Sequence, residues 1–132
     1  MEPLTQRSCV ACRSDTPTLT LEEITRLQPQ IPQWVVEENR RLRHTFRFQD
    51  FVTALAFVNQ IGALAEEEGH HPDLYLAWGK VGVVLWTHKI GGLSDNDFIM
   101  AAKTDVLAQA APGRKADVIP GAEHKASVRS SA

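Results

Sequence analysis

Apolar side chains recur with a helical period over residues 50–68, the longest periodic stretch in the chain. Asp50 is a candidate N-cap for this helix, and Gly69 is a candidate for the left-handed residue that ends it. The side chains expected to form its buried stripe are Phe51, Leu55, Val58, Ile61 and Ala65. The pattern therefore predicts an amphipathic helix that packs on a core.

Two shorter helices are predicted on either side of this one. Thr20 begins the first, with Glu23 three residues later in position for a capping box, and Pro29 follows its end. Ser94 begins the last helix, and Asp97 occupies the equivalent third helical position.

Between these helices, two stretches alternate apolar and polar residues with a period of two, which is typical of half-buried strands. One follows a polar turn near residues 37–41, and its apolar face comprises Leu42, His44, Phe46 and Phe48. In the other, residues 74–78 and 81–87 fold back about a turn at Gly79–Lys80. Each stretch predicts an antiparallel hairpin.

The predicted order is α-β-β-α-β-β-α, so we expect an α+β fold: a four-stranded antiparallel sheet with three helices packed on one face. The open face or an edge strand needs cover, and a second copy of the chain would supply it. Residues 1–18 are expected to be a flexible N-terminal arm, residues 19–111 the folded domain, and residues 112–132 a disordered tail.

Composition narrows the functional classes. The 132 residues are 43% hydrophobic and 23% charged, as in ordinary globular domains. A formal net charge of −2 provides no basic surface for nucleic acid or anionic membrane, and no apolar run is long enough to span a bilayer. Two cysteines cannot form a disulfide framework, and the N-terminus has no secretory pattern. We therefore expect a cytoplasmic protein.

The two cysteines, Cys9 and Cys12, lie in the segment CVAC. This spacing occurs in zinc sites and in redox pairs. A closed zinc site needs two further ligands, and the motif does not stand between a strand and a helix as redox pairs do. An unstructured or packing role is favoured, and a metal site completed by a histidine or by a second subunit is the alternative.

Three of the five histidines are predicted to meet at one end of the sheet. His70 and His71 follow the long helix, and the register of the second hairpin brings His88 close to residues 71–72. Three imidazoles suit a zinc site, or general acid–base catalysis, because histidine exchanges protons near neutral pH. A third alternative is that the adjacent pair only caps the helix end.

Other side chains favour a pocket at this position. Pro72 restricts the backbone of His71 and makes two divergent imidazoles more plausible than two ligands of one metal. Trp78 offers a ring on which a flat heterocycle can stack, although core packing is its alternative role. Asp97 can cap its own helix or accept a ring N–H, and Glu66, four residues before His70 on the helix, lies within side-chain reach of it.

Together, Glu66, His70-His71-Pro72, Trp78, His88 and Asp97 have a spacing that resembles the signature of the pterin-4a-carbinolamine dehydratase family. Two longer segments resemble the same family, namely FVTALAFVNQIGALAEEEGHHPDL and WTHKIGGLSDNDFIMAAKTD. The likeness covers about residues 19–107. The N-terminal CVAC and TPTLT resemble bacterial members, in particular those paired with phenylalanine hydroxylase.

The resemblance implies a hydro-lyase that converts 4a-hydroxytetrahydrobiopterin to quinonoid dihydropterin and water, recycling the pterin cofactor of an aromatic amino acid hydroxylase. It implies no metal or organic cofactor, with pterin as the substrate, and a homodimer or homotetramer. His70 and His88 would be the acid–base pair, and His71 would bind and orient the pterin. Substrate-binding roles would fall to Glu66, Pro72, Trp78 and Asp97.

Two alternatives come with the same resemblance. In the first, the protein is a non-catalytic pterin-binding or regulatory partner of phenylalanine hydroxylase. In the second, its pocket binds another pterin in a molybdopterin-related role.

Overall fold

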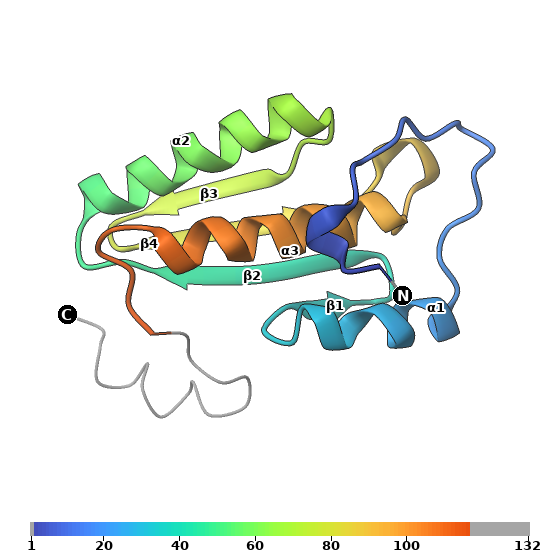
Figure 1. Ribbon diagram of the computed structural model, residues 1–132, viewed down its shortest axis with the longest axis horizontal. Helices are drawn as coiled ribbons and strands as arrows, with labels where there is room; N and C mark the ends of the chain where they lie inside the picture. Colours follow the sequence, from blue (N-terminus) through green and yellow to red (C-terminus); the bar gives the residue numbers. More distant parts are fainter. Residues whose placement is uncertain (1, 117–132) are drawn as a thin grey trace.

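A four-stranded antiparallel sheet in the order β1-β2-β4-β3 carries the fold of the computed structural model, which describes residues 2–116 (Figure 1). The strands are β1 Val35–Glu37, β2 Arg41–Arg47, β3 Asp73–Ala77 and β4 Lys80–Leu85. The α-helices are α1 Leu21–Leu27, α2 Phe51–Glu68 and α3 Asp95–Ala110, and the short 3-10 helices are η1 Leu4–Gln6, η2 Gln28–Gln30 and η3 His88–Ile90. The predicted α+β arrangement is confirmed.

The two hairpins join through their inner strands, β2 and β4. Leu42 faces Leu85 and Phe46 faces Val81 across this pairing, which makes one continuous sheet. All four side chains are buried, and with Phe48 they form the sheet side of the core. Burying these apolar surfaces is the main driving force for the sheet to close against its helices. The predicted alternation on β2 is therefore confirmed.

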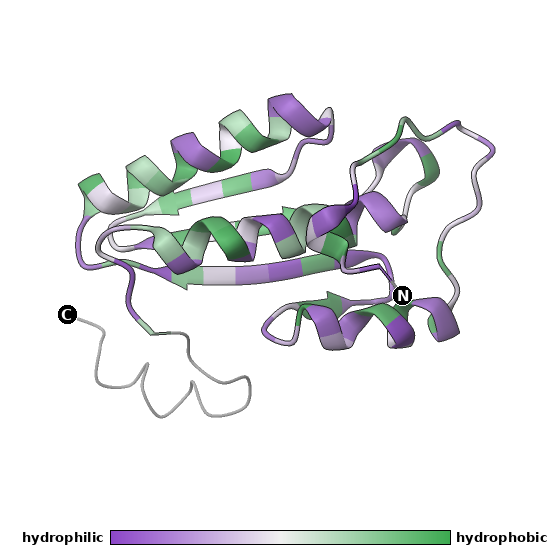
Figure 2. Ribbon diagram, in the orientation of Figure 1, coloured by the Kyte–Doolittle hydropathy of each residue, from purple (hydrophilic) through white to green (hydrophobic). Residues whose placement is uncertain are grey.

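The buried face of α2 agrees with the predicted one at Ile61 and Ala65, with Val58 partly buried, and differs from it in the first turns of the helix. Phe51 and Leu55 are 44% and 38% exposed, whereas Ala54 and Phe57 are buried. Apolar residues run around most of the first half of α2, so their period does not select a single face (Figure 2). Phe57 selects it instead, because its ring packs against Phe46 and Phe48 on β2, at centroid distances of 5.0 and 5.1 Å.

The predicted helix ends are confirmed. The Asp50 side chain accepts the Thr53 N–H at 3.0 Å, and Gly69 ends α2 with a φ of 68°. Thr20 and Glu23 form the reciprocal capping box of α1. The turn of the second hairpin lies one residue earlier than predicted, at residues 78–79, because Gly79 takes the positive φ of 70° and Ala77 pairs with Lys80.

The N-terminal arm lies against the body of the protein, and its flexibility stays a prediction. Leu4 is buried in the core, and the Arg7 guanidinium lies 2.8 Å from the carboxylate of Asp95 at the start of α3. Cys9 donates its backbone N–H to Glu68 Oε1 at 2.9 Å. At the other end, residues 113–115 pair with the end of β2, while residues 117–132 of the predicted tail lie outside the described residues.

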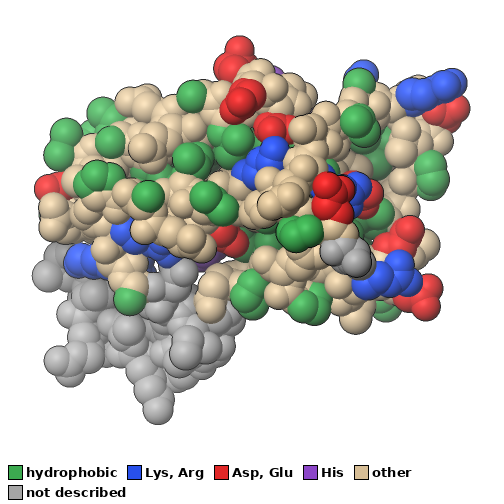
Figure 3. Space-filling model, in the orientation of Figure 1, with side chains coloured by type: hydrophobic (Ala, Val, Ile, Leu, Met, Phe, Trp, Pro, Cys, Tyr) green, Lys and Arg blue, Asp and Glu red, His purple; other side chains and the backbone are tan. Residues whose placement is uncertain are grey.

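Several large apolar side chains remain exposed on the helical face. Phe51, Val52 and Leu55 on α2 and Val106 on α3 are between 38% and 66% exposed, and Figure 3 shows apolar side chains spread over this face. They offer surface for a second copy of the chain, and the homo-oligomer stays a prediction. Among the described residues, no helix is both long and apolar enough to cross a membrane.

The Glu68 side chain on α2 contacts both the N-terminal arm and α3, so substituting it tests how much these contacts stabilise the fold. The backbone N–H of Cys9 and the Lys103 ammonium, 2.6 Å away, lower the pKa of the Glu68 carboxyl. A lowered pKa stabilises the fold above the unfolded value of about 4.3 and loses that effect as pH falls through the folded pKa. We expect Glu68→Gln to lose about 1 kcal/mol of unfolding free energy at pH 7, and less below pH 4, measured by urea denaturation.

The neighbouring Glu67→Gln is the matched control, since the Glu67 side chain is exposed and makes no hydrogen bond within residues 2–116. An equal loss of stability in the two variants, or a Glu68→Gln deficit that does not shrink in acid, would contradict this assignment.

Candidate active site

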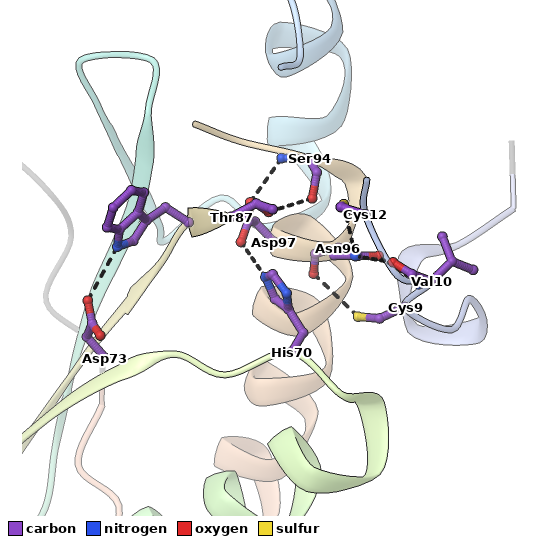
Figure 4. A network of polar contacts seen from close by, with 10 residues as sticks. Cys9, Val10, Cys12, His70, Asp73, Thr87, Ser94, Asn96 and Asp97 are labelled. Carbon is purple, nitrogen blue, oxygen red and sulfur yellow. Dashed lines mark hydrogen bonds and ion pairs between the residues drawn. The ribbon is translucent and has the colours of Figure 1, made fainter. Parts of the chain in front are cut away.

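The first turn of α3 holds a buried carboxylate at the centre of a polar network. Asp97 is fully buried, and its Oδ2 accepts the Ser94 backbone N–H at 2.9 Å and the Thr87 hydroxyl at 2.8 Å. Its Oδ1 lies 2.6 Å from His70 Nε2 (Figure 4). These donors replace the water that a buried carboxylate has lost. Asp97 thus caps its own helix and binds a histidine ring, the two roles weighed from the sequence.

His70 reaches this carboxylate because α2 ends where it does. The left-handed Gly69 turns the chain out of the helix, and the N–H groups of Gly69 and His70 both return to the Ala65 carbonyl. The His70 side chain is 12% exposed. Because Asp97 Oδ1 accepts from Nε2, neutral His70 carries its proton on Nε2 and leaves Nδ1 as the nitrogen able to take a proton.

The His71 side chain diverges from that of His70 and contacts a different carboxylate, that of Glu66. Its Nε2 lies 2.6 Å from Glu66 Oε2 on the last turn of α2, and both side chains are largely exposed. Water screens this pair, so it orients the ring more than it stabilises the fold. The predicted divergence of the two imidazoles is confirmed, and Glu66 pairs with His71 although it is spaced four residues from His70.

His88 enters from the end of β4. It follows the buried Thr87 and begins the 3-10 helix η3, with its side chain exposed. The His88 ring stands edge-on to Trp86, with a centroid distance of 4.0 Å and an interplanar angle of 87°. The Arg41 guanidinium covers the Trp86 ring at 5.4 Å, and the Trp86 indole N–H points to Asp73 Oδ2 at 3.4 Å. Trp86 is therefore held from several sides.

All three imidazoles line one cavity of about 340 Å³. Its walls come from four segments: residues 10–12 of the arm, residues 69–73 after α2, residues 86–89 after β4, and Asn96 on α3. The volume lies in the range of small-molecule sites. The predicted convergence of the histidines is therefore confirmed.

The remaining predicted site residues are distributed unevenly. Pro72 lines the cavity, and Asp97 and Glu66 stand behind the rings of His70 and His71 without lining it. Trp78 is 66% exposed at the opposite end of β3, about 17 Å along the strand from Asp73, and is not part of this cavity wall. A substrate-binding role for Trp78 stays a prediction.

Sequence reasoning missed several residues of the cavity. Trp86 had a signal, because it lies two residues before His88 on the segment that the hairpin register brings to this end. The arm residues 10–12 and Asn96, which contacts them, had no signal, because nothing local in the sequence shows where the arm docks; Lys89 had one, since it directly follows His88.

The side chains that line this cavity are able to carry out proton transfer. Within residues 2–116, no group of three or more His, Cys, Asp or Glu side chains is arranged to hold a metal ion. The imidazoles of His70 and His71 each have one nitrogen held by a carboxylate and one left over, which suits them to donate or accept protons.

Known proteins with similar sequences and structures share a family. The family model for pterin 4 alpha carbinolamine dehydratase matches residues 17–107. Proteins named "Putative pterin-4-alpha-carbinolamine dehydratase" are 51% identical in Syntrophotalea carbinolica, over 83% of this chain and the whole relative, and 52% identical in Nitrosococcus oceani, over 81% and 97%.

Two solved structures extend the likeness. One, described as a transcriptional coactivator/pterin dehydratase from Brucella melitensis, is 32% identical with a TM-score of 0.64, covering 68% of this chain and 97% of that one. The other, a pterin dehydratase-like protein identified as a RuBisCO assembly factor in the alpha-carboxysome, is 26% identical with a TM-score of 0.50, covering 57% and 88%. The chain therefore belongs to the pterin 4 alpha carbinolamine dehydratase family.

Proposed function

We propose that this protein dehydrates a 4a-hydroxytetrahydropterin, with 4a-hydroxytetrahydrobiopterin as the candidate substrate, to quinonoid dihydropterin and water. The observation that carries the proposal is the cavity in which His70, His71 and His88 meet, with His70 held by the buried Asp97. The family membership and the names of the relatives support the same chemistry.

The reaction asks for two proton movements and no oxidation. The bond from C4a to the hydroxyl oxygen breaks, and a proton delivered to that oxygen lets it leave as water. The proton on N5 is lost as the quinonoid system forms. Positioned acid and base groups each contribute about 10²–10⁴-fold to such steps.

His70 is the best candidate for the base. Asp97 holds the proton of His70 on Nε2, so Nδ1 has a free electron pair that can accept the N5 proton. Asp97 also stabilises the imidazolium that this transfer creates, because a buried carboxylate and a positive ring attract strongly. His88 is then the partner that protonates the leaving hydroxyl, and His71 binds and orients the ring.

The cavity suits a flat bicyclic ligand. Its 340 Å³ volume fits one heterocycle, and Trp86 presents an immobilised aromatic surface beside His88. Asp73 and Lys89 place charges on the same wall, where they can pair with the donors and acceptors of a pterin. The proposed reaction uses no metal and no cofactor besides the pterin itself.

In the cell this activity would recycle the pterin of an aromatic amino acid hydroxylase in the cytoplasm, with the chain acting as a homodimer or homotetramer. A non-catalytic role is the second candidate, because one similar structure is described as an assembly factor rather than as an enzyme. Stopped-flow turnover of enzymatically generated 4a-hydroxytetrahydropterin separates the two. A rate equal to the spontaneous one, in the presence of intact protein, would favour the binding role.

Replacing each cavity histidine should lower turnover without unfolding the chain. We expect His70→Ala and His88→Ala to reduce kcat by about 10²-fold or more, and His71→Ala to raise KM more than it reduces kcat. The stopped-flow assay, run with and without a chelator, measures these effects, and far-ultraviolet circular dichroism checks the fold.

Tyr75→Phe is the control, since Tyr75 is exposed on β3 and is not part of the cavity. Full activity in both His70→Ala and His88→Ala would overturn the acid–base assignment. Activity that a chelator abolishes would show that a metal takes part.

Asp97→Asn tests whether the carboxylate sets the proton position on His70. The Ser94 N–H and the Thr87 hydroxyl both need an acceptor, so the amide oxygen of Asn takes the place of Oδ2 and its NH₂ group faces His70. Nε2 must then accept, and the proton moves to Nδ1. We expect kcat to fall at least about 10-fold with little change in pterin affinity, measured by turnover and by tryptophan fluorescence titration.

Asp50→Asn is the matched control, because the same exchange at the distant start of α2 preserves an N-cap. Equal kcat values for Asp97→Asn and the unmodified protein would show that Asp97 is needed only for the fold of the loop.

A further inference from the structure

The N-terminal residues 10–12 form a wall of the cavity, and the family resemblance assigns them no role. Val10, Ala11 and Cys12 line the same cavity as His70 and His88. The family model, however, matches residues 17–107 and begins after this segment. The CVAC motif is therefore placed beside the proposed chemistry, although none of the steps assigned to the histidines uses it.

The Asn96 side chain makes two hydrogen bonds to the main chain of this segment, both at Val10. Asn96 is 5% exposed, and its Oδ1 accepts the Val10 N–H at 3.0 Å while its Nδ2 donates to the Val10 carbonyl at 2.6 Å (Figure 4). This reciprocal pair mimics the bonds between neighbouring strands and fixes both the position and the orientation of the peptide. Nδ2 also lies 3.6 Å from Cys12 Sγ.

The flanking residues are fastened as well. Cys9 donates its N–H to Glu68, and its thiol points to the Asn96 carbonyl at 3.7 Å. Burial, reinforced by the Glu68 carboxylate, raises the pKa of the Cys9 thiol to about 12, so this thiol stays protonated. On the other side, Lys89 donates to the Cys12 carbonyl at 3.4 Å. Cys9 thus has a packing role, whereas Cys12 borders the cavity.

Some main-chain polar groups of the residues that line the cavity are left over. Among the described residues, the Ala11 N–H and carbonyl and the Cys12 N–H have no hydrogen-bond partner. A pterin carries an amide, an amino group and ring nitrogens along its edges, and each needs a partner once it leaves water. Main-chain groups on a fastened segment are well suited to that task, because they are already ordered.

We propose that residues 10–12 are part of the pterin-binding site, where their main-chain groups bind the edge of the heterocycle, and that Asn96 is the positioning residue that holds them there. This inference rests on the proposed function, since it takes a pterin as the ligand of the cavity. Asn96 adjoins Asp97, so one turn of α3 positions both the binding wall and His70.

Cysteine alkylation of the unmodified full-length protein tests whether residues 10–12 are part of the pterin-binding site. Iodoacetamide labelling of Cys12, followed by peptide mass spectrometry, should slow at least about 10-fold when 7,8-dihydrobiopterin is present. Cys9 is the internal control, because its protonated thiol reacts slowly with or without the pterin. If the pterin binds, as read by tryptophan fluorescence, and Cys12 labelling is unchanged, the inference is wrong and the proposed function stands. If no pterin binds, both are wrong.

Asn96→Ala removes the two hydrogen bonds to Val10 and so tests the positioning role of Asn96. We expect KM to rise about 10-fold or more with kcat within about 3-fold of the unmodified protein, because the histidines and Asp97 keep their contacts while the wall is released. Gln109→Ala, exposed at the other end of α3, is the matched control. An unchanged KM, or a kcat loss that exceeds the KM effect, would overturn the positioning role. The labelling result decides the inference if Asn96→Ala does not fold.

Discussion

The buried carboxylate of Asp97 is the interaction on which the site depends. A carboxylate removed from water is costly unless donors surround it, and here the Ser94 N–H, the Thr87 hydroxyl and the His70 ring supply them. These donors come from the start of α3, the end of β4 and the link after α2. Satisfying one charge therefore draws three separate segments to one point and sets the proton position on the catalytic candidate.

The same turn of α3 fastens the N-terminal arm. Asp95 forms an ion pair with Arg7, Asn96 forms hydrogen bonds with Val10, and Asp97 contacts the His70 ring. Three consecutive side chains thus connect the arm, the cavity wall and the His70 ring to a single helix end. A rigid helix terminus is an effective support for such a site, because its own capping bonds already restrict the backbone.

Much of the fold and part of the site could be predicted from short-range patterns. The Thr20–Glu23 capping box, the Asp50 cap, the Gly69 helix end and the alternation on β2 depend on residues within a few positions of each other. The hairpin register likewise brought His88 to His70 and His71. Trp78 was expected beside them and lies at the other end of β3, because an apolar ring on a strand does not reveal which end of the hairpin lines a cavity.

By itself, then, the sequence determined the elements, their order and the group of three histidines, because caps, turns and strand alternation act locally. The tertiary structure decided which face of the first half of α2 is buried, since Phe57 packs against the rings of β2 although apolar residues surround most of this half. It also decided that Asp97 takes His70 while Glu66 takes His71, and that CVAC docks beside the cavity. These choices depend on contacts between distant segments, and such contacts form only when the whole core closes.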